Sequence, residues 1–237
     1  RPGRFDHPHR ADDHRGDPLT LTVTAIRSSQ IQSAGLDYVV ATAGVTNPPV
    51  PWYFSRVYYG FQALPDGALY VAYNRCASDP NYPVDQFIQD VLAAIDGGGI
   101  TRVIVDLRRN TGGDSSLLEP LITALQARQA VNQPGHLFVL IGPSVFSSAV
   151  LNAMQFRQAT AAQLVGEPTG QPPNHYGETG SFVLPNTGLT VNYATKYFVY
   201  TDDTAAALFP DLPVSSTAQD LFAGRDPVLD AALAAGN

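Results

Sequence analysis

A pair of serines stands in the segment GPSVFSSAV, residues 142–150, where an apolar run ends and a helical pattern begins. Ser147 is expected in the first turn of that helix, where the helix dipole and the free N–H groups stabilise negative charge. An attacking hydroxyl and part of its oxyanion site could therefore share this turn. Serine is also a favoured helix cap, so capping is the alternative, and Ser144 and Ser148 compete for the role of nucleophile.

A loop rich in Pro and Gly, residues 166–178, holds His175 and Glu178. Imidazole accepts a proton near neutral pH, so His175 could be the base for a serine, with Glu178 orienting its ring. A solvated loop histidine without a catalytic role is the alternative. His136 directly precedes the apolar run LFVLIG, at the expected amino-terminal edge of a sheet, and is interpreted as structural.

A third loop, DLRRNTGGD at residues 106–114, carries two adjacent glycines. Gly tolerates positive φ, so Gly112 and Gly113 could turn their N–H groups toward a ligand, as the donors of an oxyanion hole must. A tight strand-to-helix turn without such a role would need the same residues.

Strand and helix patterns alternate after the turn LPDG, which predicts βαβ units around a parallel sheet. Apolar residues keep helical spacing in 84–95, 115–130 and 147–159, each after a short run typical of a buried strand. The later runs SFVLP and LTVNYATKYFVY are expected to be strands that close the sheet, and DPVLDAALAA a short final helix. We expect an irregular segment over 1–18, a small β-rich lead-in or cap over 19–59, and a core domain over 60–237.

Composition excludes several classes of function. No run approaches the ~18 apolar residues of a membrane-spanning helix, so no membrane span is expected. A net charge of −7 and a single lysine, Lys196, argue against nucleic acid as a partner. The lone Cys76 can form neither an internal disulfide nor a zinc site.

The motifs DLRRNTGG, FSSA, VGEPTG, YATKYF and FPDLPVSSTAQDLFAGRDPVLDAAL, in this order, resemble the tail-specific, or C-terminal processing, serine peptidases, which include tricorn-like relatives. The similarity runs from about Gly60 to the end. It implies a crotonase-like (ClpP-type) α/β core in which the attacking serine, here Ser147, opens a helix. The amide of Ser148 would then act beside Gly112 and Gly113 at the oxyanion.

The chain departs from the family pattern at two places. Val150 stands where an acidic residue usually follows the serine, and the loop after GEPT lacks the lysine that many members use as base. His175 falls at the position of that lysine and is chemically adequate as a base. Glu178 or Thr179 could orient its ring. Thr169 is a further candidate for orienting the site or binding substrate.

The resemblance implies a serine-type peptidase that forms an acyl-enzyme on Ser147 and needs no metal or organic cofactor. A peptide or unfolded protein is the expected substrate, and a homo-oligomer is an additional expectation. The family also suggests an exported or cell-envelope-associated protein of a bacterium. Two alternatives stay open: a non-catalytic binding or carrier protein on the same fold, and an esterase-like acyl hydrolase.

Overall fold

The computed structural model describes residues 8–12, 18–22, 50–202 and 204–235. The chain divides into two compact units, Arg1–Ala43 and Gly44–Asn237. In the first unit, β1 (Pro8–Asp12) pairs antiparallel with β2 (Pro18–Thr22). One strand of this hairpin lies within the segment 1–18 that was expected to be irregular, and the expected domain boundaries stay predictions. The run LDYVVATA of the expected lead-in lies outside the described residues.

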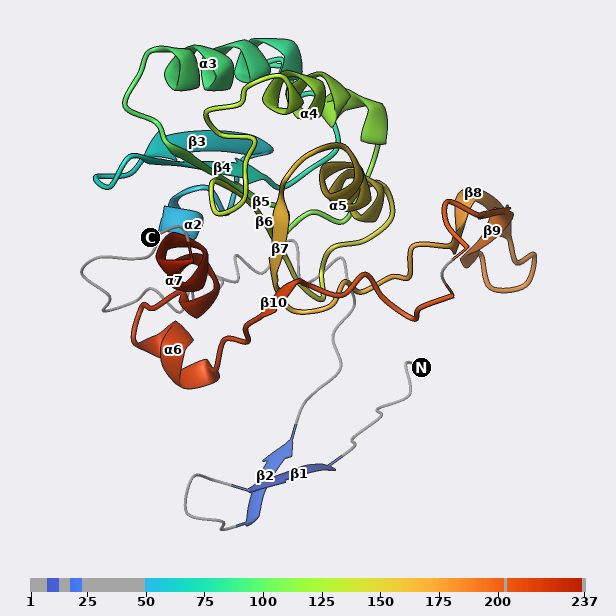
Figure 1. The fold of residues 1–237 in the computed structure, drawn as a ribbon. Helices are drawn as coiled ribbons and strands as arrows, with labels where there is room; N and C mark the ends of the chain where they lie inside the picture. Colours follow the sequence, from blue (N-terminus) through green and yellow to red (C-terminus); the bar gives the residue numbers. More distant parts are fainter. Residues whose placement is uncertain (1–7, 13–17, 23–49, 203, 236–237) are drawn as a thin grey trace. The chain divides into compact units, whose positions relative to one another are not determined.

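A six-stranded, mostly parallel sheet forms the centre of the second unit (Figure 1). Its strands are β3 (Tyr59–Ala63), β4 (Ala68–Tyr73), β5 (Arg102–Asp106), β6 (Leu137–Ile141), β7 (Gln163–Gly166) and β10 (Leu212–Pro213). The order is β10–β7–β6–β5–β4–β3, and β3 is the strand that runs antiparallel to its neighbour. Every residue of β4, β5 and β6 is buried, as is usual for strands covered on both faces. The βαβ prediction is confirmed.

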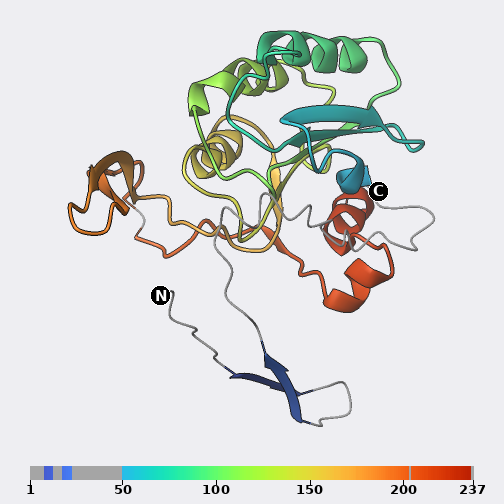
Figure 2. The same cartoon turned by 180° about the vertical axis from the view of Figure 1, so that it is seen from behind.

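Helices cover both faces of this sheet (Figures 1 and 2). The helices are α2 (Val50–Tyr53), α3 (Val84–Asp96), α4 (Glu119–Gln126), α5 (Ser148–Ala159), α6 (Ala218–Phe222) and α7 (Pro227–Ala234). The buried side chains of α3, α4 and α5 pack in one apolar cluster, and those of α7 pack with Val50 in a second. Alternate residues of β4 contribute to the two clusters, so the sheet separates them. Among the described residues, no helix is long and apolar enough to cross a membrane.

The helix expected over 115–130 is shorter than its apolar pattern. A 3₁₀ turn, η1 (Ser115–Leu118), comes first, and the Asp114 side chain accepts a hydrogen bond from the Ser116 N–H. Helix α4 then starts at Glu119. Pro120 has no N–H to donate, so it fits the first turn of a helix and not its interior.

Strands β8 (His175–Val183) and β9 (Thr190–Phe198) form a separate two-stranded sheet. The prediction that these runs close the main sheet is therefore wrong; β10 pairs with β7 at that edge instead. After β7, the loop of residues 167–174 leads the chain away, and the hairpin stands apart from the main sheet in both views (Figures 1 and 2). His175 lies at the base of this hairpin.

A buried ion-pair network joins the end of β5 to the start of α7. The Arg108 guanidinium lies 2.6 Å from the Asp106 carboxylate and 2.7 Å from that of Asp226. The Tyr70 hydroxyl donates to Asp106 at 2.8 Å. Burial alone would raise the pKa of the Asp106 carboxyl, but Arg108 more than offsets this and holds that pKa below its ordinary value.

Replacing Arg108 with leucine should lower the free energy of unfolding at pH 7 by about 3–5 kcal/mol, because a carboxylate would stay buried without its cation. Arg128→Leu is the matched control: its partner Asp96 is exposed, so loss of this pair should lower the free energy of unfolding far less than loss of the Arg108 network. Urea denaturation measures both values. Equal effects of the two variants would contradict this account.

The same network predicts a pH dependence. In the parent, the folded-state pKa of Asp106 lies below its unfolded value, so its stabilisation is present above about pH 4 and is lost as pH falls further. In Arg108→Leu, the Tyr70 hydroxyl and the backbone N–H of residue 108 would still donate to Asp106, but the cation that offsets burial would be lost, so the pKa of Asp106 would rise relative to the parent. Protonation would then relieve the buried charge, so the difference in stability between parent and variant should shrink on acidification.

Candidate active site

Four loops meet at the carboxyl ends of neighbouring parallel strands, the place where α/β folds build sites. Ser147 follows β6 and directly precedes α5. Its backbone has φ 52° and ψ −127°, a conformation that residues with a Cβ rarely adopt. Its side chain makes no capping hydrogen bond to the helix. Capping therefore does not explain the serine, and backbone strain of this kind is typical of functional positions.

Two neighbours support the strained backbone of Ser147. The buried Gln171 side chain accepts a hydrogen bond from the Ser147 N–H. Gly112 lies so close that a Cβ on it would be 2.7 Å from the Cβ of Ser147, so this position requires glycine. Sequence reasoning missed Gln171, because a single glutamine in a Pro- and Gly-rich loop has no recognisable pattern.

The N–H groups of Gly113 and Ser148 are the available oxyanion donors. Within the described part of the chain, no group accepts a hydrogen bond from either N–H. The first turn of a helix leaves such donors free, which accounts for Ser148. The Gly112 N–H, also predicted as an oxyanion donor, is engaged in this structure, where it donates to Asn110 Oδ1 at 2.9 Å.

The alternative nucleophiles are placed less favourably than Ser147. The Ser148 side chain is buried and donates to the Gly113 carbonyl at 2.6 Å, so its hydroxyl supports the glycine loop. Ser144 lines a different hollow, beside Arg108 and Arg109. Ser147 and Ser148 both share a cavity with His175. Among the described residues, no hydrogen bond engages the Ser147 hydroxyl, so Ser147 is the better-placed nucleophile of this segment.

A buried polar cluster holds the glycine loop, Gly112–Gly113, in position. Asn110 donates to the Tyr73 carbonyl at 2.9 Å, and its Oδ1 accepts from the Cys76 thiol at 3.4 Å as well as from Gly112. The thiol also lies 3.4 Å from Asn152 Oδ1. Burial raises the pKa of Cys76 to about 11, so the thiol stays protonated and remains a donor at neutral pH.

His175 is buried, with 6% of its surface exposed. Its Nδ1 lies 2.9 Å from the Pro173 carbonyl and 3.2 Å from that of Pro172. A carbonyl only accepts, so Nδ1 carries the proton, and the lone pair of the neutral ring is on Nε2. The ring packs 5.8 Å from Tyr200 and 6.1 Å from Phe198, centroid to centroid.

Glu178 and Thr179, which were predicted to orient this ring, do not contribute the hydrogen bonds seen at its Nδ1. The exposed Glu178 carboxylate pairs with Lys196 Nζ at 3.4 Å. The hydrogen bond to His175 that was predicted for Glu178 is made by the proline carbonyls instead. Glu178 has a positive φ of 50° and still lines the same cavity. Thr179 is exposed on β8 and is not part of the cavity lining.

Thr169 does not line the cavity and supports the loop that contains Gln171. Its side chain is buried, donates to the Gln171 carbonyl at 2.8 Å and accepts from the Leu208 N–H at 2.9 Å. It therefore fixes the loop that presents Gln171 to Ser147. A role in binding substrate is not supported by this position.

A cavity of about 380 Å³ brings the central residues together. Its lining includes Gly113, Ser147, Ser148, His175 and Glu178, with an apolar wall of Leu151, Phe198 and Tyr200. Among the residues described, no three His, Cys, Asp or Glu side chains are grouped as metal ligands. The polar groups of this cavity include the Ser147 hydroxyl, the His175 imidazole and the amides of Gly113 and Ser148, beside Asp114, Ser115 and Glu178.

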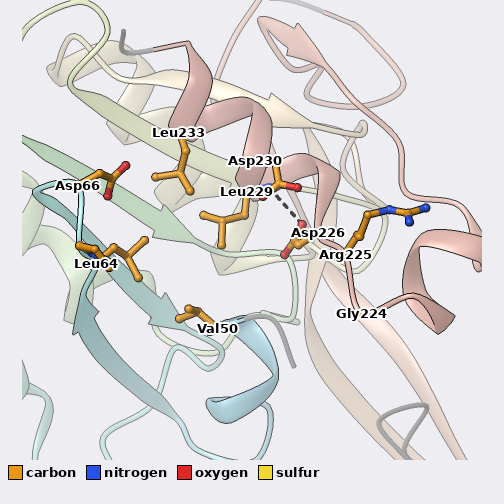
Figure 3. Close-up of a pocket in the computed structure, with 10 residues that line it drawn as sticks. Val50, Leu64, Asp66, Gly224, Arg225, Asp226, Leu229, Asp230 and Leu233 are labelled. Atoms are coloured by element: carbon orange, nitrogen blue, oxygen red, sulfur yellow. Dashed lines mark hydrogen bonds between the residues drawn. The ribbon is translucent and has the colours of Figure 1, made fainter. Parts of the chain in front are cut away.

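A larger hollow of about 490 Å³ lies between the β3–β4 turn and α7 (Figure 3). Leu229 and Leu233 of α7 face Leu64 across it, with Asp66 and Asp230 near its rim. It contains none of the predicted site residues. We place the chemistry in the smaller cavity, because only that one combines a candidate nucleophile with a candidate base.

The mixed α/β fold around a mostly parallel six-stranded sheet matches that of the S41 and tricorn peptidase domains, of the ClpP or crotonase-like type. The α/β core expected from the sequence is confirmed at this level, and the β-rich lead-in stays a prediction. No protein-family model and no curated protein matches the chain. The resemblance to peptidases therefore rests on solved structures and on the motifs.

Three solved structures illustrate the similarity. A candidate peptidase from Parabacteroides merdae matches 75% of this chain and 64% of its own, with 20% identity and a TM-score of 0.57. A candidate S41 protease from Bacteroides fragilis matches 97% of this chain and 65% of its own, with 17% identity and a TM-score of 0.52. The tricorn protease matches 95% of this chain and 21% of its own, with 14% identity and a TM-score of 0.52. The chain spans less than two thirds of each of these proteins, and the likeness is one of fold.

Proposed function

We propose that this protein is a serine peptidase that forms an acyl-enzyme on Ser147. One observation carries the proposal: a strained serine at a helix start shares a cavity with a buried histidine whose Nδ1–H is held by a carbonyl. The free amides of Gly113 and Ser148 beside that serine support the same chemistry. The fold shared with S41-type peptidases agrees with it.

In the proposed acylation step, Nε2 of His175 accepts the Ser147 hydroxyl proton while Oγ attacks the peptide carbonyl carbon. The carbonyl oxygen becomes negatively charged, and the N–H groups of Gly113 and Ser148 stabilise it. Collapse of this intermediate breaks the C–N bond. The proton on His175 passes to the leaving amine, which leaves an ester on Ser147.

Deacylation repeats these roles with water as the nucleophile. His175 takes a proton from water as the hydroxide attacks the ester carbonyl, and returns it to Ser147 Oγ as the acid product leaves. In this scheme the Pro173 carbonyl does what a carboxylate does in a Ser-His-Asp triad: it fixes the tautomer and the ring orientation. A neutral carbonyl stabilises the imidazolium less than a carboxylate would, so we expect a modest turnover rate.

The proposed substrate is a peptide or an unfolded protein segment. Leu151, Phe198 and Tyr200 give the cavity an apolar wall that suits a hydrophobic side chain next to the scissile bond. No resident cofactor is part of the mechanism. A location outside the bacterial cytoplasm or in the cell envelope stays part of the proposal.

A non-catalytic binding protein on the same fold is the second candidate. It is favoured by one observation: within the described residues, no carboxylate contacts His175. An esterase-like acyl hydrolase would use the same machinery as the peptidase on a different leaving group.

Labelling with a fluorophosphonate separates these functions, because it reacts only with an activated serine hydroxyl. We expect the folded protein to label, and heat-denatured protein to remain unlabelled. Absence of labelling in the folded protein would support the binding protein. A labelled protein that cleaves an aryl ester but not fluorescein-labelled casein would support the esterase.

A further inference from the structure

The β8–β9 hairpin has few stabilising contacts outside itself. It stands apart from the main sheet in both views (Figures 1 and 2), and both of its edges are unpaired among the described strands. Its strands carry two charged side chains, Glu178 and Lys196, which pair with each other. An isolated two-stranded hairpin is marginally stable in water, and long edges with few charges tend to associate.

One side of this hairpin is aromatic, and we call it the aromatic face. It consists of Tyr176, Phe182, Tyr193 and Tyr197, whose side chains are 50–69% exposed. The rings of Tyr176 and Tyr197 lie 4.7 Å apart, and those of Phe182 and Tyr193 lie 6.2 Å apart, centroid to centroid. Residues two apart in β9 share a face, which places Tyr193 and Tyr197 on the same side.

The opposite side of the hairpin has a different character. It carries Thr179, Ser181 and Asn192, which are polar or small, and it has one exposed apolar residue, Val183, at the end of β8. At the base of the same side, His175 and Phe198 face the catalytic cavity. The aromatic face is therefore not a wall of that cavity, and substrate chemistry does not account for its exposed rings.

We propose that the aromatic face is the contact surface of a homodimer, in which it packs against the same face of a second copy. Four aromatic rings that are half to two-thirds exposed offer on the order of 400 Å² per copy, or about 800 Å² for a pair. With the flanking strand backbone this approaches the ~1,000 Å² of a weak specific interface.

Local charge at this surface does not oppose a second copy. The whole chain carries a net charge of −7, which opposes self-association. The hairpin strands carry none, because Glu178 and Lys196 cancel. A two-fold contact through one surface is also the commonest arrangement of homo-oligomers.

The dimer itself does not depend on the proposed peptidase activity, but one consequence does. His175 is the first residue of β8, so packing of two hairpins would restrict the motion of the proposed base. We therefore expect specific activity to rise with protein concentration. If a dimer forms but specific activity does not rise with protein concentration, the proposed link between the dimer and catalysis is wrong, while the proposed interface is unaffected.

Sedimentation velocity of the whole chain, from low micromolar to several hundred micromolar, tests the interface without any substrate. We expect a reversible monomer–dimer equilibrium that Tyr193→Asp weakens at least tenfold. Phe222→Asp, at an exposed aromatic of α6, is the matched control and should leave it unchanged. A monomer at every concentration, or equal weakening by both variants, would overturn the proposal.

Cross-linking keeps the test informative if Tyr193→Asp disturbs the hairpin fold. Val191 and Asn192 are neighbours in β9 and point to opposite sides, and the native Cys76 is buried. Val191→Cys, on the aromatic face, should form a disulfide-linked dimer under mild oxidation, and Asn192→Cys should form far less. Equal cross-linking of the two variants would indicate random collision, and preferential cross-linking of Asn192→Cys would indicate a different interface.

Discussion

Ser147→Ala should reduce casein hydrolysis by a factor of about 10⁴ or more, because it removes the proposed nucleophile and the hydroxyl of the neighbouring Ser148 is engaged by the Gly113 carbonyl. The melting temperature should change little, since the Ser147 side chain makes no capping hydrogen bond. A coupled peptide assay and thermal unfolding measure the two effects on the same preparation.

Ser148→Ala is the matched control for this variant. It removes the hydroxyl bond to the Gly113 carbonyl but keeps the Ser148 N–H, so we expect a loss of at most about tenfold. If Ser148→Ala abolished activity and Ser147→Ala retained it, the role of nucleophile would pass to Ser148.

His175→Ala should lower the rate of acylation by a factor of about 10²–10⁴, the usual contribution of a general base. His136→Ala is the control, because that exposed ring bonds to the Thr101 carbonyl at the amino-terminal edge of the sheet, as the sequence predicts. The rate of fluorophosphonate labelling reports acylation directly in both variants.

Added imidazole provides a second readout for His175. A free imidazole that enters the emptied cavity should restore part of the labelling rate in His175→Ala and should not affect the parent. Full labelling in His175→Ala without imidazole would remove this residue from the mechanism.

The strand–helix core could be predicted because its pattern is local. Buried strands such as Leu137–Ile141 are continuous apolar runs, and α3 keeps its apolar residues at helical spacing. The β8–β9 hairpin could not be placed, because a strand run does not specify its partner strand. Tyr193 and Tyr197 read as strand residues in either arrangement, and only the fold shows that they are exposed.

The sequence was enough to predict the central residues of the candidate site, but not which hydrogen bonds they make. Ser147 and His175 follow predicted strands, so their meeting at one edge of the sheet was expected. The acceptor for Nδ1 was predicted to be a side chain, but it is the carbonyl of Pro173, which any residue could supply. The choice between the Gly112 and Gly113 amides likewise depends on Asn110, which takes the first of them.

The central claim is that Ser147 is an activated nucleophile, and the most direct measurement is the position of the fluorophosphonate adduct. Labelled protein would be digested with trypsin, and the peptide that ends at Arg157 would be fragmented in a mass spectrometer to locate the added mass. The account predicts one adduct, on Ser147, which is lost in Ser147→Ala and slowed in His175→Ala. An adduct on Ser144 or Ser148, or no adduct on the folded protein, would contradict it.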